Sequence, residues 1–155
     1  TDDIPQFNLF DNENKIYTRP RLLPPSKFQK TLIEKSLISE GCILNAKEIK
    51  KSVIGIRSRI GVDTIIQNSY VMGNDYYQSL EDMNEDIYND KLLVGIGERC
   101  FINNALVDKN VRIGNDVYIN GGKHLENCSN ELYAVKDGIV VIKKGATIPN
   151  NFVVK

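Results

Sequence analysis

The most constraining feature of this sequence is a spacing of five or six residues between successive aliphatic side chains. An amphipathic helix would place its apolar residues three and four positions apart, and a half-buried strand would alternate every second residue. A step near six instead indicates short parallel strands separated by turns, with three steps closing one triangular coil. The leading residues of the steps are Ile38, Ile43, Ile49, Ile54, Ile60, Ile66, Val71, then Ile96, Ile102, Val107, Ile113, Ile119, and finally Ile142, Ile148 and Val153.

The individual repeats share a second pattern. Residues 54–59, 60–65 and 113–118 begin with an aliphatic residue followed by glycine, and a small residue such as Ser58 or Thr64 often stands fifth. We expect the small residue to lie inside the coil near a turn. Glycine, asparagine and aspartate would supply the left-handed backbone conformations of the turns. The sequence therefore predicts an all-β fold, a parallel β-helix of hexapeptide repeats over residues 29–155, and the resemblance to that class implies a left-handed coil.

Two segments interrupt the repeat, and a third precedes it. Loop insertions are expected at about 74–93, where acidic residues gather, and at 120–137. Long insertions in a solenoid emerge as loops and often carry function, although a solvated acidic loop is the plainer interpretation of the first. Residues 1–28 contain four prolines and little periodicity, which predicts an extended connector and a chain cut from a longer protein.

Composition excludes several functions. Lysine and arginine together number 20, and aspartate and glutamate together also number 20, so the net charge is zero. The charge balance therefore gives no indication of binding to nucleic acid or to a membrane surface. No apolar run is long enough to span a bilayer. The three cysteines, Cys42, Cys100 and Cys128, lack metal-ligand spacing and fit a reducing compartment, with the first two as small core residues.

The residues offer little catalytic chemistry. A β-helix of this kind could be an acyltransferase, which would need a histidine as general base, but the single histidine, His124, falls in the second insertion. We expect no catalytic residue and no metal site. Basic residues are more suggestive, because outward side chains on nearby coils could form one patch for a phosphate or another small dianion. The candidates are Lys109, Arg112, Lys143 and Lys144.

Six segments make the sequence resemble the C-terminal domain of ADP-glucose pyrophosphorylase, or glucose-1-phosphate adenylyltransferase, in its cyanobacterial and plant branch. They occur in the family's order, and two of them, MGNDYYQ and GIVVIKKGATIP, are not general features of hexapeptide repeats. The segments are TRPRLLPPSK at 18–27, SVIGIRSRI at 52–60, VMGNDYYQ at 71–78, VGIG at 94–97, LVDKNVRIG at 106–114 and DGIVVIKKGATIP at 137–149.

The resemblance implies a function for the whole enzyme and a role for this domain. The family's enzyme converts ATP and glucose 1-phosphate to ADP-glucose and pyrophosphate with Mg²⁺, in glycogen or starch synthesis, in the bacterial cytoplasm or the plastid. Its nucleotide-binding catalytic domain lies N-terminal, so residues 1–28 would lead from that missing domain. The β-helix domain packs on it, helps to build a homotetramer and contributes to a site for a phosphorylated effector. This domain alone should be inactive and need no cofactor of its own.

Two lysines carry the effector site in the resemblance. The motif DKNxRIG matches Lys109 and the motif GIVxxxK matches Lys144, residues that the family associates with the activator 3-phosphoglycerate and the inhibitor phosphate. Arg112 is a further candidate. Asp137 departs from the serine common in that branch, and an acid beside the site would weaken phosphate binding.

Three alternatives stay open at this point. One is the hexapeptide acyltransferase, and another is a structural oligomerisation module without a ligand. The third is the β-helix of another nucleotidyltransferase, such as a mannose-1-phosphate guanylyltransferase.

Overall fold

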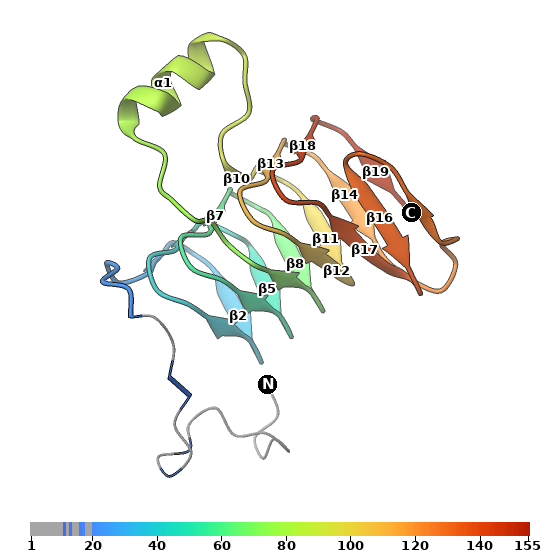
Figure 1. Cartoon of the computed structure of the whole chain (residues 1–155), viewed down its shortest axis with the longest axis horizontal. Coiled ribbons are helices and arrows are strands. Elements are labelled where there is room, and N and C mark those ends of the chain that lie inside the picture. The colour runs from blue at the N-terminus through green and yellow to red at the C-terminus, as the bar shows by residue number, and fades with distance from the viewer. Residues whose placement is uncertain (1–10, 12, 14–15, 18–19) are drawn as a thin grey trace.

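The computed structural model describes residues 11, 13, 16–17 and 20–155, and the strands stack side by side as a solenoid (Figure 1). Three sheets form its faces, and each takes one strand from successive coils. Sheet A contains β1 (Lys27–Phe28), β4 (Ile43–Leu44), β7 (Arg59–Ile60), β10 (Gly95–Ile96), β13 (Arg112–Ile113) and β18 (Thr147–Ile148). Sheet B contains β2 (Leu32–Glu34), β5 (Glu48–Lys50), β8 (Ile65–Gln67), β11 (Phe101–Asn103), β14 (Tyr118–Asn120) and β19 (Val153–Val154).

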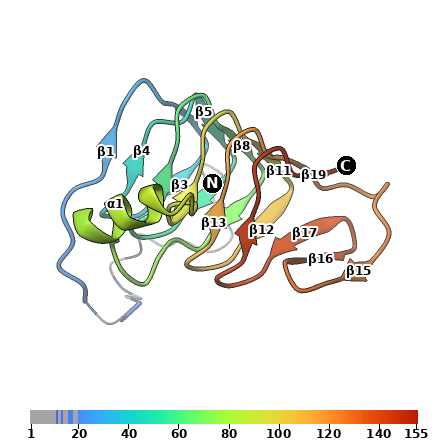
Figure 2. The ribbon, with the colours of Figure 1, turned by 90° about the horizontal axis from the view of Figure 1, so that it is seen from above.

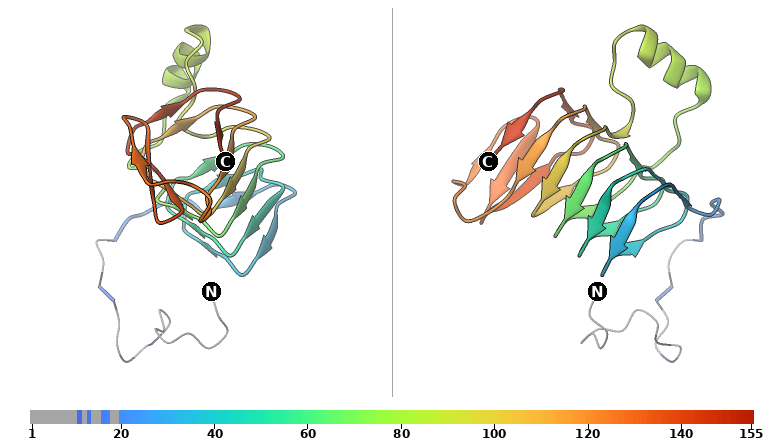
Figure 3. Two further views of the ribbon diagram at one scale, coloured as in Figure 1. Left: turned by 90° about the vertical axis from the view of Figure 1, so that its right-hand side faces the viewer. Right: turned by 180° about the vertical axis from the view of Figure 1, so that it is seen from behind.

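Sheet C completes the triangle and differs from the other two at its C-terminal end. Its parallel strands are β3 (Leu37–Ile38), β6 (Val53–Ile54), β9 (Tyr70–Val71), β12 (Ala105–Val107) and β17 (Ile139–Ile142). Two antiparallel strands, β15 (Cys128–Ser129) and β16 (Tyr133–Lys136), extend the sheet beyond β17. The views in Figure 3 show the coils following one another in chain order along the solenoid.

Pairing one coil apart explains the predicted spacing. Ile102 in β11 pairs with Ile66 of the preceding coil and with Ile119 of the following coil, so the three side chains form one buried column. Such a column removes apolar surface from water at roughly 25 cal/mol per Å², which is the main force that holds the coils together.

Two of the predicted core positions are wrong by one residue. Leu44 is fully buried in place of Ile43, because β4 aligns with β7 so that Leu44 pairs with buried Ile60. Val154 is likewise buried, whereas Val153 is 51% exposed. Ile38 is only partly buried, because its strand is the outermost one of sheet C.

The small residues lie inside the coils, as predicted. Ser58, Thr64 and Cys100 are buried, and Cys42 is buried as well. The Thr64 hydroxyl donates to the carbonyl oxygen of Gly97 (2.8 Å) and accepts from the N–H of Cys100 (3.1 Å). These residues therefore satisfy backbone groups at the turns, where regular strand pairing stops.

The prediction that the second-position glycines of the repeats supply the left-handed turn conformations is wrong. Gly61 and Gly97 follow their aliphatic residues because the next coil passes too close for a side chain: a Cβ on Gly97 would lie 2.4 Å from the carbonyl oxygen of Gly114. The left-handed positions come two residues later, and most of them are not glycine. Asp63, Arg99 and Asp116 hold them with φ of 58°, 54° and 59°.

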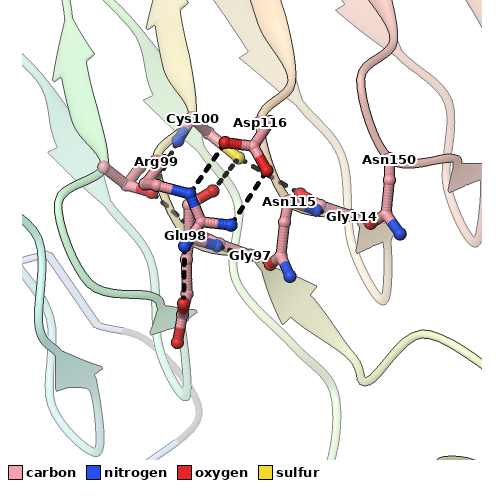
Figure 4. A network of polar contacts seen from close by, with 9 residues as sticks. Gly97, Glu98, Arg99, Cys100, Gly114, Asn115, Asp116 and Asn150 are labelled. Atoms are coloured by element: carbon pink, nitrogen blue, oxygen red, sulfur yellow. Dashed lines mark hydrogen bonds and ion pairs between the residues drawn. The ribbon is translucent and has the colours of Figure 1, made fainter.

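Left-handed corner residues of successive coils stack on one another. Arg99 lies beside Asp116, with Nε and Nη2 donating to the two carboxylate oxygens at 2.7 and 2.8 Å, and Nη1 reaches Glu98 at 3.0 Å (Figure 4). This pair holds the pKa of the Asp116 carboxyl below its usual range. The corner thus carries a two-pronged ion pair between neighbouring coils.

The insertions contain more structure than the expected loops. The segment at 74–93 forms the one helix among the described residues, α1 (Leu80–Tyr88), which projects from the solenoid in Figures 1 and 3. Seen from above in Figure 2, α1 lies in front of the strands. Its N-terminus is closed by a capping box between Ser79 and Asp82. The segment at 120–137 contains the hairpin of β15 and β16.

The expected connector is shorter at its C-terminal end, because β1 already belongs to sheet A at residues 27–28. Its first part lies largely outside the described residues. Residues 20–26 belong to no helix or strand.

Candidate anion-binding site

The candidate site lies at one edge of the triangular coil, the C–A corner, where the chain passes from sheet C to sheet A. Lys109 follows β12 at this corner, and Lys144 follows β17 one coil later. The N–H of Gly145 donates to the carbonyl oxygen of Lys109 at 2.9 Å, which stacks the two turns. The structure therefore brings together the two lysines that the resemblance singles out.

A third residue of the same corner joins the lysines. Asp75 begins the first insertion, one coil before Lys109, and its Oδ1 lies 2.7 Å from the Nζ of Lys109. Its Oδ2 lies 3.5 Å from the Nζ of Lys144. Because both ammonium groups approach one carboxylate, a single small anion placed there could reach both.

Asn110 completes the polar cluster. Its side-chain Nδ2 donates to Oδ2 of Asp75 at 3.0 Å, and its Oδ1 accepts from the backbone N–H of Asp75 at 2.8 Å. The hydrogen bonds from Lys109 and Asn110, with the charges of both lysines, lower the pKa of Asp75 to about 2. Asp75 is therefore ionised throughout the physiological range, and the cluster stays exposed: the side chains of Lys109, Lys144 and Asp75 are 30%, 61% and 41% accessible.

The motif that begins the first insertion explains why Asp75 points at this corner. Gly73 has φ of +84° and lies so close to Ile56 that a Cβ would meet its carbonyl oxygen at 2.1 Å. Asn74 is buried, and its Nδ2 donates to the carbonyl oxygen of Arg57 at 2.9 Å. Tyr77 donates its hydroxyl proton to the carbonyl oxygen of Gly41 at 2.9 Å. These anchors fix the backbone on both sides of Asp75.

Arg112 contacts the first insertion and does not contact Asp75. Its Nη1 lies 2.5 Å from Oδ2 of Asp86 on α1 and also donates to the carbonyl oxygen of Leu92. Gln78 donates to the same Asp86 oxygen at 2.6 Å and accepts from the N–H of Val94 at 2.7 Å. The hydrogen bond from Arg112 contributes most to lowering the pKa of the Asp86 carboxyl. The structure thus assigns Arg112 to holding α1, apart from the two lysines.

A groove beside this contact does not extend the basic cluster. It has a volume of about 540 Å³, and its lining includes Asp86 and Asp90 together with Arg112 and Lys91. The formal charges of these four groups cancel, so the groove offers no surplus of positive charge to an anion.

Lys143 and Asp137 are placed differently from the expectations. Lys143 turns to the second insertion, where its Nζ donates to Ser129 Oγ at 3.2 Å and to the carbonyl oxygen of Asn130. Asp137 forms the turn between β16 and β17, with φ of 50°. Lys144 lies beyond the other end of β17, whose four residues span roughly 13 Å at about 3.3 Å per residue of extended chain. Asp137 is therefore not beside the site, because the length of β17 separates them.

The described residues contain no group of three or more histidine, cysteine, aspartate or glutamate residues able to hold a metal ion. His124 is exposed in the second insertion. The Mg²⁺ that the resemblance implies for the whole enzyme therefore finds no fitting donor set in this part of the chain. No helix in the described part is long and apolar enough to cross a membrane.

Comparison with known proteins decides the family. Residues 21–153 match the family described as the GLGC left-handed parallel beta-helix domain. The chain belongs to this family. The GLGC match confirms the left-handed parallel β-helix, and the expected resemblance to the β-helix domain of glucose-1-phosphate adenylyltransferase is confirmed as well.

A curated relative from Arabidopsis thaliana agrees with the GLGC assignment. It is named inactive glucose-1-phosphate adenylyltransferase small subunit 2, chloroplastic, and is 37% identical over 154 residues. The match covers 97% of this chain and 32% of the relative, so the chain spans about a third of the length of the curated relative that it matches.

Proposed function

We propose that this chain is the regulatory and assembly domain of a glucose-1-phosphate adenylyltransferase subunit, and that Lys109 and Lys144 bind a phosphorylated effector at the C–A corner. The observation that carries the effector site is the shared carboxylate, since the ammonium groups of both lysines lie within 3.5 Å of Asp75. A hydrogen bond between charged groups contributes about 1.5–3 kcal/mol, and two of them suit a dianion.

Regulation and catalysis would lie in different parts of the whole enzyme. ATP, glucose 1-phosphate and Mg²⁺ would bind in an N-terminal catalytic domain of the same polypeptide. An effector activates when it binds the active state more tightly than the inactive one, with a coupling of about 1–3 kcal/mol. The lysines should therefore set effector affinity and leave the rate without effector within a few-fold.

The test uses the whole enzyme that contains this domain. Lys109→Ala and Lys144→Ala should each raise the 3-phosphoglycerate concentration for half-activation by roughly tenfold or more, which corresponds to about 1.4 kcal/mol. Lys143→Ala is the matched control, because Lys143 is the adjacent lysine and contacts Ser129 and Asn130 instead of Asp75. Unchanged activation curves in both alanine variants would contradict the effector site.

The assembly role is supported by the N-terminal end of the solenoid. Strands β1, β2 and β3 are terminal in their sheets, so one edge of each has no neighbouring strand among the described residues, and Phe28, Leu32 and Ile33 are 47%, 60% and 38% exposed. Unpaired edges with apolar side chains favour association. We expect the chain to self-associate in sedimentation experiments and Leu32→Glu to weaken this. A wild-type chain that stays monomeric at high concentration would contradict the assembly role.

A further inference from the structure

The anion site at the C–A corner already holds an anion of its own, the carboxylate of Asp75. We propose that Asp75 is an intramolecular competitor for this site, and that it makes the site selective for dianions such as phosphate and phosphate monoesters over monoanions. The proposal rests on the proposed function, because it concerns the ligand of Lys109 and Lys144.

Both oxygens of Asp75 are engaged by groups that a ligand would need. Oδ1 accepts a hydrogen bond from the Nζ of Lys109. Oδ2 accepts one from the Nδ2 of Asn110 and lies 3.5 Å from the Nζ of Lys144. An incoming anion therefore has to replace Asp75 at the ammonium groups. The displacement requires little movement, because the side chain is 41% accessible and the backbone N–H of Asp75 keeps its own bond to Asn110.

Charge decides which ligands can displace the carboxylate. Two lysines and Asp75 sum to a formal charge of +1. When a monoanion replaces Asp75, the formal charge of the two lysines and their ligand stays at +1. The monoanion must also compete with the Asp75 carboxylate, which has a high effective concentration because it is tethered to the site. A dianion brings the sum to zero, so it gains an attraction that Asp75 cannot supply. Phosphate, sulfate and phosphate monoesters meet this condition, whereas simple carboxylates do not.

A purely structural role for Asp75 makes a different prediction. If the carboxylate only anchored the first insertion, its loss would loosen the corner and weaken or leave unchanged the binding of anions. If it competes, its loss should strengthen binding, above all for monoanions. Asp75→Asn separates the two roles, because the amide keeps the shape and an oxygen acceptor while removing the negative charge.

The experiment measures anion binding to the 155-residue chain by isothermal titration at constant ionic strength, with inorganic phosphate, sulfate and acetate as probes. Asp75→Asn should bind phosphate and sulfate roughly tenfold more tightly than the wild type, and the preference for sulfate over acetate should shrink. Asp63→Asn is the matched control, since it makes the same change at another corner and asparagine tolerates its φ of 58°. The control should stay within about twofold.

The outcomes distinguish failure of this inference from failure of the proposed function. Wild-type binding that is lost in Lys109→Ala and Lys144→Ala, but unchanged or weaker in Asp75→Asn and in Asp75→Ser, overturns the competitor and leaves the site. Absence of lysine-dependent binding in every variant overturns both. Thermal melting of each variant verifies the fold, and Asp75→Ser serves as the second variant if Asp75→Asn unfolds.

Discussion

The N–H of Gly145 donates a hydrogen bond to the carbonyl oxygen of Lys109, and the left-handed φ of +70° at Gly145 turns the chain immediately after Lys144. The conformation of Gly145 therefore helps to position the backbone of Lys144, the second lysine of the site. Among the described residues, no atom outside its chain neighbours lies within 4 Å of a Cβ built there, so the position is limited by backbone conformation and not by space.

Gly145→Ala should lower the free energy of unfolding by about 1–2 kcal/mol, the usual penalty for a Cβ in a left-handed conformation. Gly145→Asn should lose less, because asparagine enters this region more readily. Urea denaturation measures both. Equal losses in the two variants would show that the conformation of Gly145 is not what limits the position.

Gly97→Ala tests the opposite constraint. Gly97 has no left-handed φ, but its Cβ would lie 2.4 Å from the carbonyl oxygen of Gly114 in the next coil. Backbone cannot yield as a flexible side chain can, so we expect a loss of about 2 kcal/mol or more in the same denaturation experiment. A loss no larger than that of Gly145→Asn would contradict the close-packing explanation.

Arg112→Gln should release α1 without affecting the lysine pair. Arg112 ties the helix to sheet A through Asp86 and Leu92, while Lys109 and Lys144 contact Asp75. Limited proteolysis should then cut within residues 79–92 several times faster than in the wild type. Phosphate affinity should stay within about twofold. A loss of affinity as large as that of Lys109→Ala would instead place Arg112 in the site.

Asp116→Asn should lower the melting temperature at neutral pH, by about 1–3 °C for an exposed ion pair in a chain of this size. Arg99 lowers the pKa of Asp116 in the folded chain. The stabilisation is therefore fully present above the unfolded pKa of about 3.9 and is lost as the pH falls through the folded pKa.

The difference between Asp116→Asn and the wild type should accordingly shrink when melting is followed from pH 7 down to pH 3. Asp63→Asn, at a left-handed position with φ of 58°, provides the control for the substitution itself. A difference that persists unchanged at pH 3 would assign the loss to something other than the charge of Asp116.

The fold could be predicted because burial imposes its spacing on every coil. Ile66, Ile102 and Ile119 must align for the core to close. This requirement appears in the sequence as a spacing of five or six residues between aliphatic side chains. Ile43 and Val153 were misplaced because adjacent aliphatic residues satisfy the spacing equally well, and only pairing with a neighbouring strand chooses between them.

The site could be predicted in part. Lys109 and Lys144 each follow a core residue, Val107 and Ile142, by two positions, and those core residues pair in sheet C. Spacing alone therefore carried a signal that both lysines occupy one corner. Asp75 was not predicted, because its direction depends on buried Asn74 and on Tyr77 contacts that no periodicity records. Arg112 was grouped with the lysines because the sequence does not show which outward side chains meet an insertion.

The first insertion leaves the solenoid and re-enters it without disturbing the register. Ile96, just after the insertion, pairs with Ile60 of the preceding coil, as an uninterrupted coil would place it. The number of residues inserted at this point therefore does not affect the alignment of the coils on either side. Lengthening such a surface segment costs little, about 0.6 kcal/mol for each doubling of a flexible loop. The corner that carries Asp75 is thus a place where the solenoid can accommodate extra chain without any change in its core.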